Sequence, residues 1–127
     1  MKIAKEVAKM ELIEINKYNT QEILINIQNY DGEIDVLNFV VEDALKNIVF
    51  KKTLLDGITK QENNKYIVSI EANDTKDTNP LYKYTYYIEI LLSGNDVVQT
   101  AKKGDFKVDE SSTSLKEEIE VNGKNSN

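Results

Sequence analysis

Hydrophobic and polar residues alternate along most of this chain, and this alternation predicts short β-strands. Within residues 21–29, Ile23, Ile25 and Ile27 share one parity, while most of the polar side chains fall on the other. Within residues 82–92, tyrosine, isoleucine and leucine residues again occupy one parity along the whole segment. A period of two places one side of a strand in the core and the other side toward water. The second segment is therefore expected to be a long strand in the centre of a sheet.

The same pattern divides the chain into seven to nine short strands separated by turns. Asp-Gly pairs at 31–32 and 56–57 predict hairpin turns, and turns are also expected at 93–96 and 102–105. The expected strands span 11–15, 21–29, 34–45, 47–55, 58–62, 66–72, 82–92, 97–101 and 106–108. No long helical pattern interrupts them, which favours an all-β, antiparallel β-sandwich, with a barrel as the alternative.

The two ends of the chain differ from this strand-rich centre. We expect residues 1–9 to form a short helix or loose arm, residues 10–110 to form one β-sandwich domain, and residues 111–127 to form a polar tail. In the tail, the spacing of Leu115 and Ile119 allows a helical turn or two, and a frayed end is the alternative. Because core packing leaves these two segments free, one of them is expected to mediate assembly.

Composition excludes several classes of function. The 127 residues include no cysteine and no histidine, which removes disulfides, thiolate zinc sites and the commonest general base. The net charge is −6 and every basic residue is lysine, so nucleic acid is not an expected partner. The chain holds no apolar run of about 18 residues, so no membrane span is expected. Its first residues, MKIAKEVAKM, do not resemble a secretory signal, and we expect synthesis and folding in a cytoplasm.

Four tyrosines raise the question of a carbohydrate platform, because aromatic rings stack on sugars. They are Tyr82, Tyr84, Tyr86 and Tyr87. The parity of Tyr84 and Tyr86 continues into isoleucines, which favours a structural role in the core over a solvent-facing platform.

Two further patterns of acidic or amide residues are weighed as sites. Adjacent acidic residues could supply an acid and a base, but neighbours on a strand point to opposite faces, so no catalytic role is expected. These pairs are Glu42 with Asp43, Asp109 with Glu110, and Glu117 with Glu118. A calcium site in the loop 73–79 would use the oxygens of Asn73, Asp74, Asp77 and Asn79. That loop lacks a glycine, so an ordinary turn-rich loop is favoured, and no catalytic, cofactor or metal residue is predicted.

The order of turns and strands resembles the N-terminal immunoglobulin-like domain of phage baseplate upper proteins from Gram-positive phages and prophages. The matching pieces are an Asp-Gly turn leading into Ile-Asp-Val, an Asp-Thr loop, a Tyr-x-Tyr-x-Ile strand, a Val-x-Thr strand and a Gly-x-Phe-x-Val ending. In this chain they are Asp31, Gly32, Ile34, Asp35 and Val36; Asp74 and Thr75; Tyr84, Tyr86, Ile88 and Ile90; Val98 and Thr100; and Gly104, Phe106 and Val108. The first turn, at Lys17 to Thr20, and Tyr87 depart from the family pattern.

The resemblance implies an immunoglobulin-like sandwich that serves as a structural and assembly component of a phage or prophage tail. Its implied partners are other tail or baseplate proteins, with a homo-oligomer as a further possibility, and its implied location is the virion. A carbohydrate-binding or adhesion domain that contacts a bacterial surface glycan is the alternative. A small hydrolase is a distant third, because the chain lacks the His, Cys and Arg from which activated nucleophiles and oxyanion clamps are commonly built. No enzymatic activity is predicted.

Overall fold

The computed structural model describes residues 12–17, 20–30, 32–62, 64–109 and 118–123, and the expected arm at 1–9 lies outside them. The described part is almost entirely β-structure, which confirms the all-β prediction. The elements are β1 Ile13–Asn16, β2 Gln21–Gln28, β3 Ile34–Glu42, β4 Ile48–Leu54, β5 Gly57–Glu62, β6 Lys65–Ile70, the 3-10 turn η1 Ala72–Thr75, β7 Tyr84–Leu92, β8 Gln99–Asp109 and β9 Glu118–Asn122. No helix among these residues is long and apolar enough to cross a membrane.

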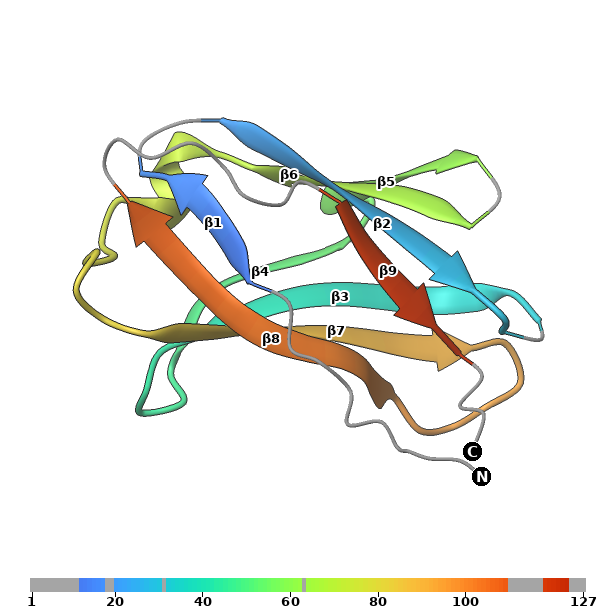
Figure 1. The fold of residues 1–127 in the computed structure, drawn as a ribbon. Coiled ribbons are helices and arrows are strands. Elements are labelled where there is room, and N and C mark those ends of the chain that lie inside the picture. The colour runs from blue at the N-terminus through green and yellow to red at the C-terminus, as the bar shows by residue number, and fades with distance from the viewer. Residues whose placement is uncertain (1–11, 18–19, 31, 63, 110–117, 124–127) are drawn as a thin grey trace, which may run out of the picture.

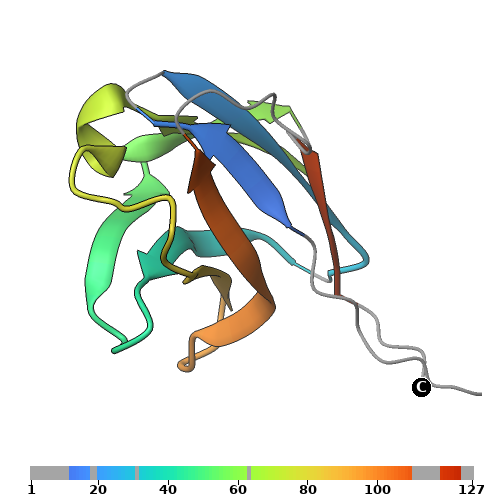
Figure 2. The ribbon, with the colours of Figure 1, turned by 60° about the vertical axis from the view of Figure 1, so that its left-hand side comes forward.

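The strands form one curled sheet in the order β1-β8-β7-β3-β4-β5-β6-β2-β9. Figure 1 shows how the sheet folds over on itself, so that β2, β5 and β6 lie across from β3, β7 and β8. Strand β4 runs along the side that joins these two layers, as the turned view shows (Figure 2). The space between the layers holds the core.

The prediction that all strands would pair antiparallel is wrong. Strands β1 and β8, β2 and β9, and β4 and β5 are parallel pairs, and the other pairs are antiparallel. The hairpins expected at 31–32 and 56–57 are wrong: β2 and β3 do not pair with each other, and β4 and β5 are consecutive but run parallel. Strands β1 and β9 are also not joined to their neighbours by the hairpins that give antiparallel pairs. They add to the sheet from the two ends of the chain, and the result is a mixed sheet.

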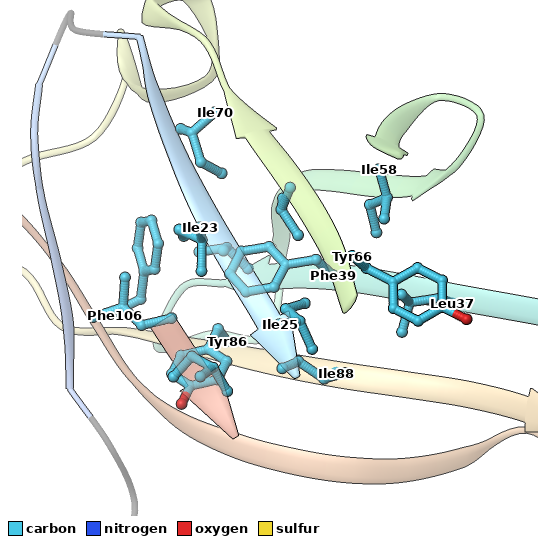
Figure 3. Close-up of a cluster of buried hydrophobic side chains, with 14 of the residues drawn as sticks. Ile23, Ile25, Leu37, Phe39, Ile58, Tyr66, Ile70, Tyr86, Ile88 and Phe106 are labelled. Carbon is cyan, nitrogen blue, oxygen red and sulfur yellow. The ribbon is translucent and has the colours of Figure 1, made fainter. Parts of the chain in front are cut away.

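The predicted alternation of side chains is confirmed in the central strands. Ile25, Tyr86 and Ile88 are all fully buried and face the space between the layers (Figure 3). The ring of Tyr86 stacks on that of Phe39, with centroids 5.7 Å apart and planes inclined by 17°. On the opposite face of β3, Val40 is also buried, and its cross-strand neighbours there are Lys51 of β4 and Tyr87 of β7. Burial of these rows stabilises the fold by about 25 cal/mol per Å² of apolar surface removed from water.

The turn expected at 102–105 is wrong, because β8 is continuous through this segment. Gly104 does not end the strand; it pairs with Tyr86 on β7, where a bulky side chain lies opposite a residue without one. A bulge between Ile88 and Glu89 absorbs the extra residue in β8. The strand expected at 97–101 accordingly begins only at Gln99.

The helical or frayed tail expected beyond 110 is wrong for its described part, which is strand β9. Ile119 and Val121 are 0% and 1% exposed and pair with Ile25 and Ile27 of β2. The intervening residue, Glu120, points outward. The two apolar side chains therefore follow a period of two and complete the core, rather than lying on a helical face.

Candidate functional site

A groove opens between the two layers where β2 leads into β3. Its volume is about 630 Å³, and the ends of β2, β3, β4, β5 and β6 contribute to its lining. This volume falls within the range of about 300–1,000 Å³ that small-molecule sites occupy. The groove is therefore the first candidate for a functional site in the described part of the chain.

The floor of the groove is apolar. Ile27 and Tyr66 are nearly completely buried there, and Ile34 and Leu54 are half-buried beside them. The ring of Tyr66 belongs to the core, but its hydroxyl points away from Phe39, as Figure 3 shows. The floor thus combines hydrocarbon surface with one phenol group.

Tyr30 forms a wall of the groove, and the end of β9 packs closely against its ring. The Gly123 N–H donates to the carbonyl of Gln28 at 2.7 Å, which brings the Gly123 backbone over the ring. A Cβ atom on Gly123 would lie 2.5 Å from ring atom Cδ2 of Tyr30. Only glycine permits this close approach, so the position of Tyr30 depends on β9.

Two carboxylates, those of Glu33 and Asp35, come from the β3 side of the groove. The register of β3 against β7 shifts between Ile34 and Val36, so Asp35 lies in a β-bulge. Ser93 holds this segment: its hydroxyl donates to Asp35 Oδ1 at 3.0 Å, and its N–H donates to the Glu33 carbonyl at 2.8 Å. Bulges redirect side chains, and they are common beside functional sites.

Lys60 and Asn64 come from the β5–β6 side, in the facing layer. The register of this hairpin also shifts, between Lys60 and Glu62, so a second bulge borders the groove. Asn64 has a φ of 69°, and its carbonyl accepts a hydrogen bond from Ile27 N–H at 2.8 Å. The Lys60 ammonium and the Asn64 amide thus bring hydrogen-bond donors to the layer that faces the two carboxylates.

Leu55 also lines the groove and has an unusual backbone conformation. Its φ is 69°, a value that bulky residues rarely adopt, and its side chain is 97% exposed. The exposed side chain adds nothing to core packing, so burial does not explain the unusual φ. A strained, fully exposed leucine at the edge of a groove is a feature that a binding role would explain.

The two phenols keep their protons well above neutral pH. Burial raises the pKa of Tyr30. Burial also raises the pKa of Tyr66, and the nearby Glu33 carboxylate raises it further. Both hydroxyls can therefore donate as well as accept hydrogen bonds at neutral pH.

The tyrosines singled out from the sequence lie elsewhere. Tyr84 and Tyr86 are buried, which confirms their structural interpretation, and Tyr84 Oη accepts a hydrogen bond from Asn79 N–H at 2.9 Å. Tyr82 is 65% exposed in the loop before β7. Tyr87 is half-buried on the outer face of the sheet. These side chains are divided between the core, a loop and the outer face, and they do not form one aromatic platform.

The oxygen-rich loop 73–79 uses its side chains to hold its own backbone. Asp74 Oδ2 accepts from Glu71 N–H at 2.7 Å and from Lys52 Nζ at 2.8 Å. Asn79 Oδ1 accepts from Leu81 N–H at 2.8 Å. In the part of the chain that the structure describes, no three acidic, histidine or cysteine side chains are grouped as metal ligands. The turn-rich interpretation is favoured over a calcium site.

Among the adjacent acidic residues, both members of the pair Glu42 and Asp43 are described: Glu42 ends β3, and Asp43 begins the loop that follows. Asp43 accepts hydrogen bonds from the N–H groups of Asn47 and Leu45, both at 2.9 Å, and the bond from Asn47 is the main cause of its lowered pKa. It shapes the loop between β3 and β4. Of the other two pairs, one member each, at 110 and 117, lies outside the described residues.

Comparison with known proteins adds no relative: no family model matches the chain, and no curated protein is detectably similar to it.

Sequence patterns did not indicate the groove, because its polar side chains come from separate segments. Glu33 and Asp35 follow the Asp-Gly turn at 31–32, and Lys60 and Asn64 flank the turn between β5 and β6. Each looks like an ordinary polar residue beside a turn. Only the pairing of the sheet shows that the two turns lie at the same end of the molecule.

Proposed function

We propose that this chain is an immunoglobulin-like β-sandwich that serves as a structural and assembly component of a phage or prophage tail, at the baseplate or tail tip. It acts through protein–protein contacts with other tail proteins and resides in the virion. The proposal draws on the resemblance over residues 10–110, and the two facing layers of strands are compatible with it.

The observation that carries the proposal is a set of exposed apolar side chains at the end of the sheet opposite the groove. Leu45 and Ile48 border the β3–β4 loop and are 81% and 59% exposed, and Leu81 and Tyr82 precede β7 and are 88% and 65% exposed. We call these four residues the apolar end. Glu42 pairs with both Ile48 and Thr85, which places the two loops at the same end of neighbouring strands.

Exposed apolar groups that gather on one region mark surfaces that another protein covers. Loops held by a rigid sheet are also the usual place for such contacts. The loops of the apolar end are held in place from within. Asp43 binds two backbone N–H groups of the first loop, and the phenol of Tyr84 binds the backbone of the second. A fixed surface loses little conformational entropy when a partner binds.

The test is to purify tail particles from an induced lysogen that encodes this chain, and to search them for the protein by mass spectrometry and immunogold electron microscopy. The chain is expected in the particles at a fixed ratio to other tail proteins. The double variant Leu45→Ser/Leu81→Ser should fold but fail to enter the particles, while Val97→Ser, at the other end of the sheet, should enter normally. Particles that contain no trace of the protein would refute the proposal.

The arm hypothesis requires a separate measurement. Deleting residues 1–9 and measuring mass by light scattering tests whether this segment mediates self-association. Deleting residues 111–127 is a less direct test than the sequence suggested, because it also removes β9 and its two buried side chains. An unchanged mass after deletion of 1–9 would assign assembly to another surface, of which the apolar end is the first candidate.

A further inference from the structure

The groove between the layers has features that neither core packing nor the apolar end explains. Two β-bulges border it, at Asp35 and at the turn between β5 and β6, and a strained leucine lies at its edge. Bulges and positive φ angles of bulky residues are common beside functional sites, which makes this end of the sheet a candidate for a role beyond folding.

We propose that the groove binds an uncharged, polyhydroxylated ring, that is, a saccharide unit of a glycan. Each hydroxyl of a sugar both donates and accepts a hydrogen bond. The groove offers acceptors on one side, at Glu33 and Asp35, and donors on the facing side, at Lys60 and Asn64. A ring lying between them satisfies both sides at once. This inference is independent of the proposed tail function.

The apolar floor fits the other property of a pyranose ring, its hydrocarbon face. Ile34 and Leu54 supply aliphatic surface within the groove, Leu55 lies at its edge, and Tyr30 supplies an aromatic wall. The Tyr66 hydroxyl adds a phenol that donates and accepts beside the floor. Binding sites of this size commonly combine apolar surface with a few polar groups that fix the orientation of the ligand.

The charges of the groove select against other occupants. Two carboxylates and one ammonium group leave an excess of negative charge, which disfavours phosphates and other anions. A lysine side chain from a protein partner would suit Glu33, but it would meet Lys60 on the facing side. A neutral ligand avoids both conflicts. Because a lysine side chain would still suit Glu33, a basic peptide is the competing outcome of the test.

Parts of the groove are held in place before any ligand arrives. The Asp35 side chain is held by the Ser93 hydroxyl, Gly123 packs against the Tyr30 ring, and the Asn64 backbone is bonded to Ile27. These parts need little ordering on binding, which matters for saccharides because each hydrogen bond to them contributes only about 1 kcal/mol net.

The test is a titration of ¹⁵N-labelled protein, followed in ¹H–¹⁵N correlation spectra. The probes are neutral trisaccharides of glucose and of N-acetylglucosamine, and a lysine-containing peptide of similar size. With at least one neutral trisaccharide, saturable shifts are expected at the backbone amides of Tyr30, Glu33, Asp35, Asn64 and Tyr66, with Kd at or below about 1 mM.

Two conservative variants test the assigned contacts. Tyr66→Phe removes only the hydroxyl and Glu33→Gln removes only the charge, so each should weaken binding about five- to tenfold. Tyr87→Phe, on the outer face, is the matched control and should bind like the wild type. If either groove variant fails to fold, the shifts of the wild-type protein alone still decide the question.

Three results would overturn the proposal. One is the absence of shifts with both neutral trisaccharides up to about 10 mM. Another is a set of shifts confined to the outer face around Tyr87. The third is saturable binding of the lysine peptide at the groove without any sugar binding, which would assign the site to a protein partner instead. None of these results bears on whether the chain enters tail particles.

Discussion

Replacing Ile119 by alanine tests whether the last strand is part of the folded core. The side chain of Ile119 is 0% exposed and lies on β9, which pairs with β2 in the region of Ile25. The change removes three carbons, each worth about 0.8 kcal/mol when buried. Transfer alone gives about 2.4 kcal/mol, and the cavity left behind raises the expected loss in the free energy of unfolding to about 3 kcal/mol.

A loss of this size is easy to measure, because domains are stable by only about 5–15 kcal/mol. Urea unfolding followed by circular dichroism should show a lower midpoint with an unchanged slope, and the melting temperature should fall by about 10 °C. Val97→Ala is the control: Val97 is 75% exposed, so its loss should stay within about 0.5 kcal/mol. A cost below about 0.5 kcal/mol for Ile119→Ala as well would show that β9 does not contribute to the core, and the strand assignment would then be wrong.

Three further substitutions or conditions test other details of the structure. Gly57→Ala should destabilise the fold by about 1–3 kcal/mol in urea unfolding, because φ is +100° there and a Cβ would lie 2.4 Å from Lys52 Cδ; an unchanged midpoint would contradict this turn. Gly123→Ala should displace the Tyr30 ring and shift its NMR signals, because the new Cβ would lie 2.5 Å from the ring; unshifted signals would disprove the contact. The carboxyl of Asp43 has a lowered pKa in the folded protein. Its contribution to stability is therefore present above its unfolded pKa of about 3.9 and is lost as pH falls through the lower folded value. An NMR titration that gives an ordinary or raised pKa for Asp43 would refute this.

Sequence patterns predicted the central strands well, because burial of one face imposes a strict period of two. Ile23, Ile25 and Ile27 on β2, and Tyr86 and Ile88 on β7, all lie where the alternation placed them. These features depend on local chemistry, so a single sequence contains enough information to predict them.

The errors concern features that depend on distant residues. The segment around Gly104 has the composition of a turn, but pairing with Tyr86, 18 positions earlier in the chain, keeps it in a strand. Residues 118–122 also alternate, yet the interpretation of a helical turn rested on the spacing of Leu115 and Ile119. Their parallel pairing with β2 spans most of the chain, and no local pattern can show it.

The glutamates of β9 bear on how copies of this protein meet. Glu118 and Glu120 project from an edge strand, and both side chains accept hydrogen bonds from Asn26 Nδ2. If a second copy added its own β9 to this edge, four carboxylates would be crowded together, which disfavours continuous cross-copy sheets. Pairing of this edge with its copy is therefore disfavoured, and we expect an oligomer of this chain to form through another surface.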